Sequence, residues 1–201
     1  MKKTNQILQV LFTLLITTAL VNSASGQGNY KLVQSSSNMK VIGTSTVHDW
    51  EMDVTNFNGS VSINKDGNKL TISTLFFLAK ANSIESDKSL MNKKTKEALK
   101  TDDHSRITFR FKEVKKLNTN SDNFSGTIIG DLTIAGVTRK VNIDFSGKRS
   151  GNKLYVNDTH TVDMTDYNID PPTAMLGSIK TDKEVKISYN LTFKTNDLES
   201  K

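Results

Sequence analysis

The chain has no cysteine among its 201 residues, and it has only two prolines and one tryptophan. Without cysteine the protein has no disulfide framework, no thiolate nucleophile and no thiolate metal ligand. A lipoprotein anchor on an N-terminal cysteine is excluded for the same reason. The fold must therefore be held by its core alone, and a chain of this length is long enough for one domain with a full core.

Signatures of catalysis and of metal binding are also missing. The three histidines, His48, His104 and His160, do not form the i, i+4 pair of a zinc helix. The sequence contains no nucleophile elbow, phosphate loop, dinucleotide fingerprint or calcium loop. Asp102 and Asp103 stand beside His104, but they follow a helix-like stretch and precede a strand, where polar turn residues are expected. We therefore expect no catalytic residue, no metal and no cofactor.

The positive charge of the chain does not indicate nucleic-acid binding. The formal net charge is +6, but the lysines are scattered among acidic residues. The densest group, "NKKTK" at 92–96, lies on a helix-like stretch without aromatic neighbours. A nucleic-acid surface needs a basic stripe with rings that stack on bases. We therefore expect no nucleic-acid partner.

Residues 1–26 have the layout of a secretory signal peptide. Lys2 and Lys3 are followed by a mostly apolar run at 7–21, and Ala24 and Gly26 precede an expected cleavage before Gln27. The run is short for a membrane span of about 20 residues. We expect a periplasmic or secreted protein, residues 27–201, that has no stable membrane span once the signal is removed.

The rest of the chain is mostly strand-like. Ile107, Phe109 and Phe111 alternate with polar residues, which is typical of a strand with one dry face and one wet face. Asp-Gly at 66–67 is a hairpin signal. Short links between about eight to ten strands favour an antiparallel barrel or sandwich. The predicted strands are 69–81, 106–114, 126–136, 139–147, 153–158 and 184–194.

Two stretches depart from the strand pattern. Residues 86–100 contain few β-branched residues and place Leu90, Met91 and Leu99 near helical spacing. They predict a short amphipathic helix that serves as a lid over one barrel opening. Residues 167–184 contain two consecutive prolines, which a central strand does not accept, and apolar residues that include Met175. A long loop of this kind is expected to fold over a pocket mouth.

Five segments resemble, in order, the YceI-like family of exported polyisoprenoid-binding proteins. The resemblance implies an all-β fold, an antiparallel eight-stranded lipocalin-like barrel with a helix over one end. It also implies a long isoprenoid or similar lipid tail inside the barrel, with no catalytic residue and no metal site. The segments are "GTSTVHDWEMDV" (43–54), "MNKKTKEAL" (91–99), "LKTDDHSRITFRFKEV" (99–114), "GDLTIAGVTRKVNIDF" (130–145) and "IDPPTAMLGSIKTDKEVKISYNL" (169–191).

The alternation in "VHDWEMDV" places His48, Trp50 and Met52 on one face of a strand and the acids on the other. Trp50 and Met52 are expected to line the barrel, and His48 is expected near its rim, either as a structural residue or as a partner for a ligand head group. The residues expected to contact the ligand are His48, Trp50, Met52, Phe76, Leu90, Met91, Phe109, Phe111, Ile143, Phe145 and Met175.

Three functions are consistent with these patterns. The first is a binding protein that buries a long apolar tail, since each buried CH₂ contributes about 0.8 kcal/mol. The second is a barrel with a filled core that acts as a structural or interaction protein. The third, which has the least support, is a secreted lipid hydrolase that uses His48 or His104. The sequence leaves open the identity of the ligand and whether an edge strand pairs two barrels into a homodimer.

Overall fold

The computed structural model describes residues 26–66 and 69–195. The expected signal peptide therefore lies outside the described residues, apart from Gly26. The strands are β1 (Gly26–Leu32), β2 (Asn38–Ser45), β3 (Asp49–Val54), β4 (Phe57–Asp66), β5 (Lys69–Lys80), β6 (Ile84–Glu85), β7 (Arg106–Asn120), β8 (Asn123–Ile134), β9 (Val137–Ser150), β10 (Lys153–Asp163), β11 (Thr173–Ala174) and β12 (Ile179–Thr195). The helices are α2 (Ser89–Leu99) and the 3-10 turns η1 (Gln34–Ser36), η2 (Ala81–Ser83), η3 (Met164–Tyr167) and η4 (Met175–Gly177).

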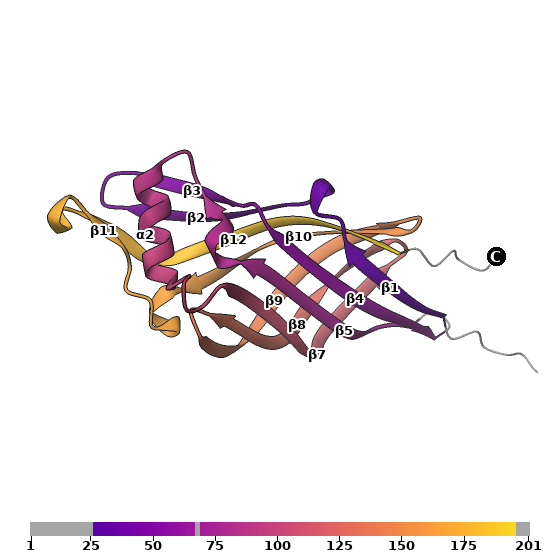
Figure 1. Cartoon of the computed structure of the whole chain (residues 1–201). Coiled ribbons are helices and arrows are strands. Elements are labelled where there is room, and N and C mark those ends of the chain that lie inside the picture. Colours follow the sequence, from indigo (N-terminus) through magenta and orange to yellow (C-terminus); the bar gives the residue numbers. More distant parts are fainter. Residues whose placement is uncertain (1–25, 67–68, 196–201) are drawn as a thin grey trace, which may run out of the picture.

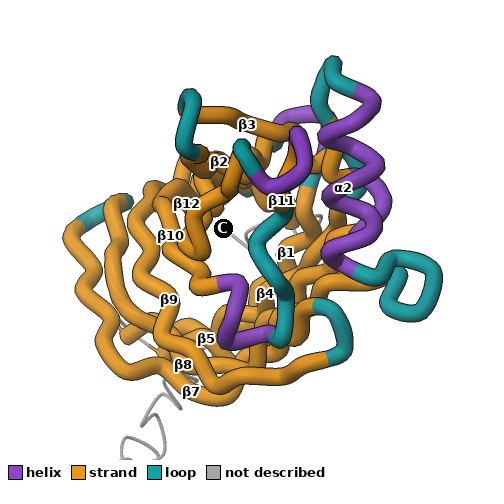
Figure 2. The backbone as a smooth tube through the Cα atoms, turned by 90° about the vertical axis from the view of Figure 1, so that its left-hand side faces the viewer, coloured by secondary structure: helices purple, strands orange, loops and turns teal. Residues whose placement is uncertain are grey.

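The strands form a closed antiparallel barrel of eight strands, as expected from the sequence. The order around the barrel is β1, β4, β5, β7, β8, β9, β10 and β12, and the pairing of β12 with β1 completes the circle. Beyond the end of β1, β12 pairs with β2, and β3 and β6 continue the wall on that side. Figure 1 shows the barrel from the side, and Figure 2 shows α2 and the β11 segment at one end. We call this end the mouth, and the opposite end the narrow end.

The predicted strands are found, and most of them are longer than expected, except that β5 ends at Lys80 and β8 ends at Ile134. The last one begins at Ile179, not at 184, because the segment after η4 already pairs with β2 and β11. Ala135 and Gly136 form the turn between β8 and β9, and both have positive φ, 46° and 80°. Strands β1, β2 and β4 were not predicted, because they contain few large apolar residues. Short hairpins join β4 to β5 and join β7, β8, β9 and β10 in series, and the pairing of β12 with β1 closes the sheet into a barrel.

Helix α2 lies across the mouth, which confirms the predicted helix and its position. Its first turn has no capping side chain at Lys88. Instead Ser86 Oγ accepts a hydrogen bond from the Lys88 amide at 3.2 Å, and the Asn92 side chain donates to the Ser86 carbonyl at 2.9 Å. The helix ends at Lys100, which adopts the left-handed conformation with φ 52°. Thr95 donates to the sulfur of Met52 at 3.2 Å, so the helix contacts the wall formed by β3.

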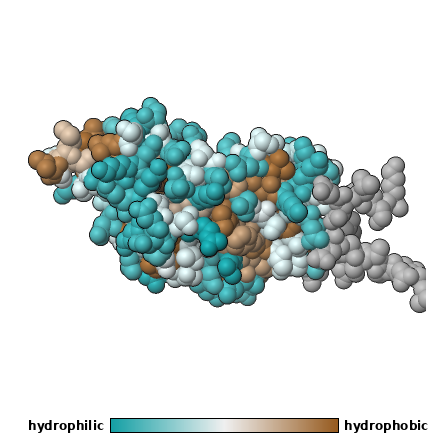
Figure 3. Space-filling view, in the orientation of Figure 1, coloured by the Kyte–Doolittle hydropathy of each residue, from teal (hydrophilic) through white to brown (hydrophobic). Residues whose placement is uncertain are grey.

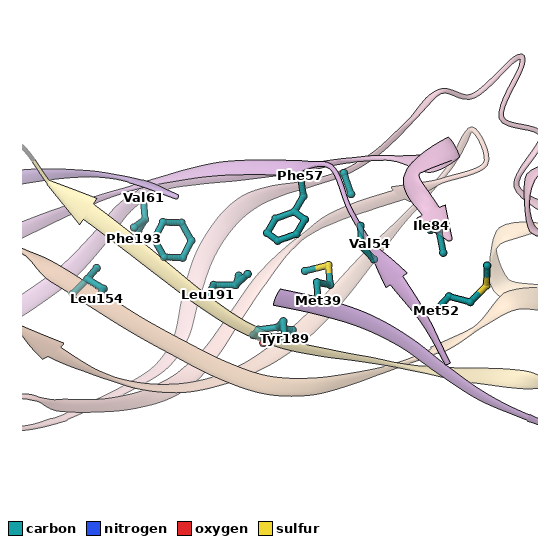
Figure 4. Packing of buried hydrophobic residues seen from close by; sticks show 11 residues of the cluster. Met39, Met52, Val54, Phe57, Val61, Ile84, Leu154, Tyr189, Leu191 and Phe193 are labelled. Carbon is teal, nitrogen blue, oxygen red and sulfur yellow. The ribbon is translucent and has the colours of Figure 1, made fainter. Parts of the chain in front are cut away.

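Apolar side chains from all sides pack together inside the barrel. The face shown in Figure 3 is mostly polar. Inside, Phe57 and Phe77 stack with ring centroids 6.0 Å apart, and Phe124 contacts Phe145 at 6.2 Å. Figure 4 shows inward-pointing side chains that come from strands around the barrel. These buried residues are Met39, Met52, Val54, Phe57, Val61, Ala79, Ile84, Leu154, Tyr189, Leu191 and Phe193.

Two neighbouring phenylalanines, Phe76 and Phe77, show which face of β5 points into the barrel. Phe77 is opposite Phe109 and packs in the interior, whereas Phe76 is opposite the exposed Arg110 and Ser60 on the outer face. The expectation that Phe76 lines the barrel interior is therefore wrong. A register shift between β4 and β5 changes which residues of β5 face inward, and the sequence run itself has no alternation that reveals it.

We predict opposite outcomes for the two neighbouring phenylalanines. Phe77→Ala should lower the free energy of unfolding by about 3 kcal/mol, because it opens a cavity in the packed interior. Phe76→Ala should lower it by less than about 1 kcal/mol, because the outer face has room to relax. Urea unfolding of both variants measures the difference. Equal losses would contradict the assigned orientation of β5.

Candidate functional site

An apolar chamber lies inside the mouth, beneath α2. It has a cavity volume of about 310 Å³, in the range of small-molecule sites. Its lining residues come from β2, β3, β6, β7, β8, β10 and β12, from helix α2, from η3 and from the segment that contains β11. Its apolar lining consists of Val41, Trp50, Met52, Ile84, Leu90, Met91, Ala98, Leu99, Ile107, Ile134, Val162, Met164, Ile169, Pro172, Ala174, Ile179, Val185 and Ile187.

Strand β3 forms the wall in the alternating manner that the sequence predicts. Trp50 and Met52 line the chamber. Asp49 and Glu51 are exposed on the other face, where Glu51 pairs with Lys40 at 2.6 Å. The acidic residues of "VHDWEMDV" therefore lie on the outer face of the sheet and do not line the chamber.

The indole of Trp50 is held in place by two contacts with the neighbouring strand. Its Nε1 donates to the Thr44 carbonyl at 3.2 Å. Its ring lies over Gly43, the residue opposite it in β2, where a Cβ would overlap the indole. Gly43 thus allows the ring to lie flat against β2, which leaves the adjacent space open.

His48 lies at the rim, in the exposed turn between β2 and β3. Its Nδ1 is 2.7 Å from the backbone carbonyl oxygen of Asp49, and its own carbonyl accepts from the Ser45 hydroxyl at 2.9 Å. The ring is thus oriented by a backbone carbonyl and not by the Asp49 carboxylate. This arrangement suits a rim residue that can hydrogen-bond a ligand.

The polar lining is grouped at the rim and contains no acid. Its ionisable members are His48 in the β2–β3 turn, Lys88 just before α2, and Lys94 in the middle of α2. Lys94 also contacts Glu97 at 3.4 Å along the helix. The remaining polar lining residues are Ser45, Thr95, Thr173 and Thr181. The chamber therefore has an apolar interior and a rim of bases and hydroxyl groups.

The other two histidines have structural surroundings. His104 packs against Gly136, where a Cβ would lie 2.5 Å from its ring, and its amide donates to the Lys100 carbonyl at 2.8 Å. His160 shares the inward face of β10 with Val162 and is opposite Ile187. Burial lowers the pKa of His160, and the nearby Asp144 opposes that shift. Within residues 26–66 and 69–195, no three His, Asp or Glu side chains gather as a metal site would require.

The structure brings some of the expected ligand-contacting residues together and separates others. His48, Trp50, Met52, Leu90 and Met91 line the chamber. Four others, Phe109, Phe111, Ile143 and Phe145, belong to the second core cluster and do not line it.

Phe76 and Met175 do not reach the chamber either. Phe76 is on the outer face, and Met175 is exposed at the η4 tip. Met175 points away because η4 turns outward just after the lining residue Ala174.

Several lining residues were missed, among them Ala98, Ile134, Val162 and Ile169. Strand alternation predicts that Ile134 and Val162 point into the barrel. It does not predict how far along the barrel axis they lie. Ala98 and Ile169 lie on elements that are not strands. Their place follows from how α2 and the loop after η3 cover the mouth.

Comparisons with known proteins give a family and a set of similar folds. Residues 30–193 match the sequence profile of the YceI-like domain. No curated protein matches the chain. Among the described residues, no helix has both the length and the apolar character needed to cross a membrane.

Three solved structures illustrate the similarity. Burkholderia cenocepacia BcnA is 13% identical, with a TM-score of 0.65 over 80% of this chain and 98% of its own. A polyisoprenoid binding domain from Saccharophagus degradans, implicated in plant cell wall breakdown, is 14% identical, with a TM-score of 0.66 over 83% and 98%. A Campylobacter jejuni YCEI protein is 16% identical, with a TM-score of 0.54 over 71% and 84%. At these identities the likeness concerns the fold.

The partly buried position of His160 predicts that the stability of the folded protein depends on pH. Because its pKa is lowered in the fold, the unfolded chain binds the proton more readily once the pH falls below the ordinary value of 6.5. The free energy of unfolding should therefore decrease as the pH falls below about 6.5, and His160→Gln should remove that component. Asn157→Gln, at an exposed position of the same strand, changes no titratable group and is the matched control, so its pH profile should match that of the parent. Urea midpoints between pH 7.5 and 5 provide the measurement, and identical profiles for His160→Gln and the parent would contradict it.

Proposed function

The chain belongs to the YceI-like family, and from that premise we propose that it is a binding protein that holds the apolar tail of an isoprenoid-type lipid in the mouth chamber. The observation that carries the proposal is the chamber itself, whose lining is mostly aliphatic, aromatic or thioether. Transfer of each CH₂ from water into such a space contributes about 0.8 kcal/mol. A tail of several isoprene units can therefore bind without any polar contact.

The proposed role is carriage or storage of the lipid in the periplasm, without chemical conversion. It is supported by the name of the similar Saccharophagus degradans domain, which is described as polyisoprenoid binding. Periplasmic or secreted localisation follows from the signal-like residues 1–26. The hydrolase alternative lacks support at the rim, because His48 is oriented by a backbone carbonyl and no acid lines the chamber. The filled-core alternative is disfavoured by the open volume beneath α2.

The rim suggests where a head group lies. A tail that enters the chamber leaves its polar end near His48, Lys88 and Lys94. With three bases and no acid at this position, an anionic head group is favoured over a neutral one.

The proposal is tested by identifying what the protein carries. The full chain is expressed with export, purified without detergent, and extracted for lipid mass spectrometry. A stoichiometric long-chain isoprenoid or similar lipid supports the proposal. An empty extract, together with no uptake of added prenyl alcohols, quinones or fatty acids, overturns it in favour of the filled-core alternative.

A substitution that fills the chamber should compete with the tail. Ala98 lines the chamber from α2, so Ala98→Phe should weaken binding of a prenyl ligand at least about tenfold by removing space for a few methylene groups. Lys96→Phe, on the exposed face of the same helix, is the control and should bind as the parent does. Quenching or shift of the single tryptophan, Trp50, reports binding because its ring forms part of the wall. Unchanged affinity in Ala98→Phe would place the ligand elsewhere.

The rim bases predict a head-group preference. A prenyl carboxylic acid should bind about fivefold more tightly than the alcohol of the same chain length. The double substitution Lys88→Met, Lys94→Met should abolish most of the preference for the acid over the alcohol. The affinity for the alcohol should stay unchanged. Lys93→Met with Lys100→Met removes equal charge from exposed positions of the same segment and should keep the preference. A preference that survives loss of Lys88 and Lys94 would show that the head group lies away from the rim.

A further inference from the structure

The most exposed large apolar side chains of the described residues all lie around the mouth. Their exposed fractions are 63% for Val47, 59% for Leu90, 72% for Met175 and 108% for Leu176. Val47 is in the β2–β3 turn, Leu90 is in the first turn of α2, and the other two form the η4 tip. Figure 3 shows the hydrophobic colour of the tip at the left end, where Figure 1 places η4.

Hydrogen bonds join two of these segments into one unit. The Thr46 amide donates to the Lys180 carbonyl at 3.0 Å, and the Lys180 amide donates to Thr46 Oγ1 at 3.2 Å. The Thr46 hydroxyl also donates to the Ser178 carbonyl at 3.4 Å. The turn that carries Val47 is thereby attached to the segment that follows η4. Leu90 lines the chamber that the same segments enclose.

The η4 tip keeps its apolar side chains in solvent through its backbone conformation. Met175 and Leu176 are consecutive residues with φ 50° and 56°, a region that non-glycine residues rarely adopt and that is costly for them. The next residue, Gly177, also has positive φ, 87°. This backbone conformation and the exposure of two apolar side chains to water are both unfavourable for the isolated domain. They indicate that the tip contacts something outside the domain.

The charge around the mouth is positive on the α2 side. Residues 86–100 contain five lysines against two acids. Lys88, at the rim, and Lys180, beside Thr46, have no ion-pair partner in the part of the chain that the structure describes. Positive side chains beside exposed apolar side chains are typical of surfaces that bind anionic lipid head groups.

We propose that the mouth end docks on an anionic lipid bilayer, with Met175, Leu176 and Val47 inserted among the head groups and the lysines of 86–100 and Lys180 near the lipid phosphates. The proposal rests on the proposed function, since docking places the chamber opening against the membrane from which a tail would enter. Transfer would then occur without exposing the tail to water.

A bilayer fits this surface better than a second protein does. The apolar side chains stand on separate protruding tips, not on one flat patch, and a stable protein interface needs about 1,000 Å² of complementary area. A fluid interface accepts protruding side chains without matching their shape. The combination of tips, bases and an adjacent lipid chamber therefore favours a membrane.

The test is binding of the exported protein to vesicles. The parent should cosediment with vesicles of phosphatidylglycerol and phosphatidylcholine, more weakly with pure phosphatidylcholine, and less as salt is raised. Met175→Asp with Leu176→Asp should lower the partition coefficient at least about tenfold. The matched control, Ser121→Asp with Ser150→Asp, adds the same charge at exposed hairpin residues of the narrow end and should lose less than about threefold. Mass spectrometry of the exported chain checks that residues 1–26 are absent.

A second readout reports insertion directly. Leu176→Trp in a Trp50→Phe background should shift its fluorescence to the blue when anionic vesicles are added, and brominated lipids should quench it. Ser150→Trp in the same background should show neither change. Binding that is equal in the Asp variants, or a Trp at 176 that stays in water, would overturn the proposal. So would a dimer of the parent that Leu176→Asp dissociates, because the tip would then be an interface between copies.

Failure of this proposal can be separated from failure of the proposed function. Uptake of a short prenyl ligand, followed through Trp50 without vesicles, should be unchanged in the Met175→Asp, Leu176→Asp variant. Ligand uptake without vesicle binding would support the proposed function of the chamber and contradict membrane docking. Vesicle binding without ligand uptake would support membrane docking and contradict the proposed function of the chamber.

Discussion

Closure of the sheet by β12 is the constraint on which the rest of the structure depends. This strand pairs with β10 along one edge and with both β1 and β2 along the other. The chain passes from β1 to β2 through η1, which lies beside the same edge of β12 between the two pairings. There the Thr192 amide donates to Ser37 Oγ at 2.9 Å, and the Thr192 hydroxyl donates to the Ser36 carbonyl at 2.8 Å. These bonds bury Thr192 and leave no free edge along β12, so the barrel avoids the open edge that promotes aggregation.

The same arrangement gives the barrel two unlike ends. Away from the mouth, strands surround the interior completely, and side chains such as Val61, Leu154 and Phe193 pack together there. At the mouth, the wall on the β2 side thins to the short β3–β6 pairing of Asp53 with Glu85 and Val54 with Ile84. Helix α2 covers this region. A helix cannot extend the hydrogen-bonded wall of a sheet, so its apolar stripe rests across the opening and leaves space beneath. The chamber is that space.

The sequence predicts much of the fold because alternation and turn residues are local properties. It identifies the later strands, α2 and the inward face of β3. It does not distinguish Phe76 from Phe77, because the register shift in β5 depends on its partner strand. It does not separate Phe109 from Ile107 either. Both face inward, but only Ile107 lines the chamber, and height along the barrel is set by the stagger of the strands. The rim residues on α2 and the η4 tip are placed by packing between distant segments, which no local pattern encodes.

The chamber has an energetic cost that bears on what it is for. Empty apolar volume destabilises a protein by about 24 cal/mol per Å³, so 310 Å³ would cost about 7 kcal/mol if it were closed and empty. That figure is an upper bound, because the chamber opens at the mouth and water can enter. Even a fraction of it is comparable with the net stability of a whole domain. The packed core clusters of the barrel must therefore supply the stability that lets the mouth stay hollow. A bound tail restores the missing contacts and stabilises the fold by mass action. A residue that fills the chamber should likewise raise stability while it lowers ligand affinity, and this opposition separates a site kept open for a ligand from an imperfect core.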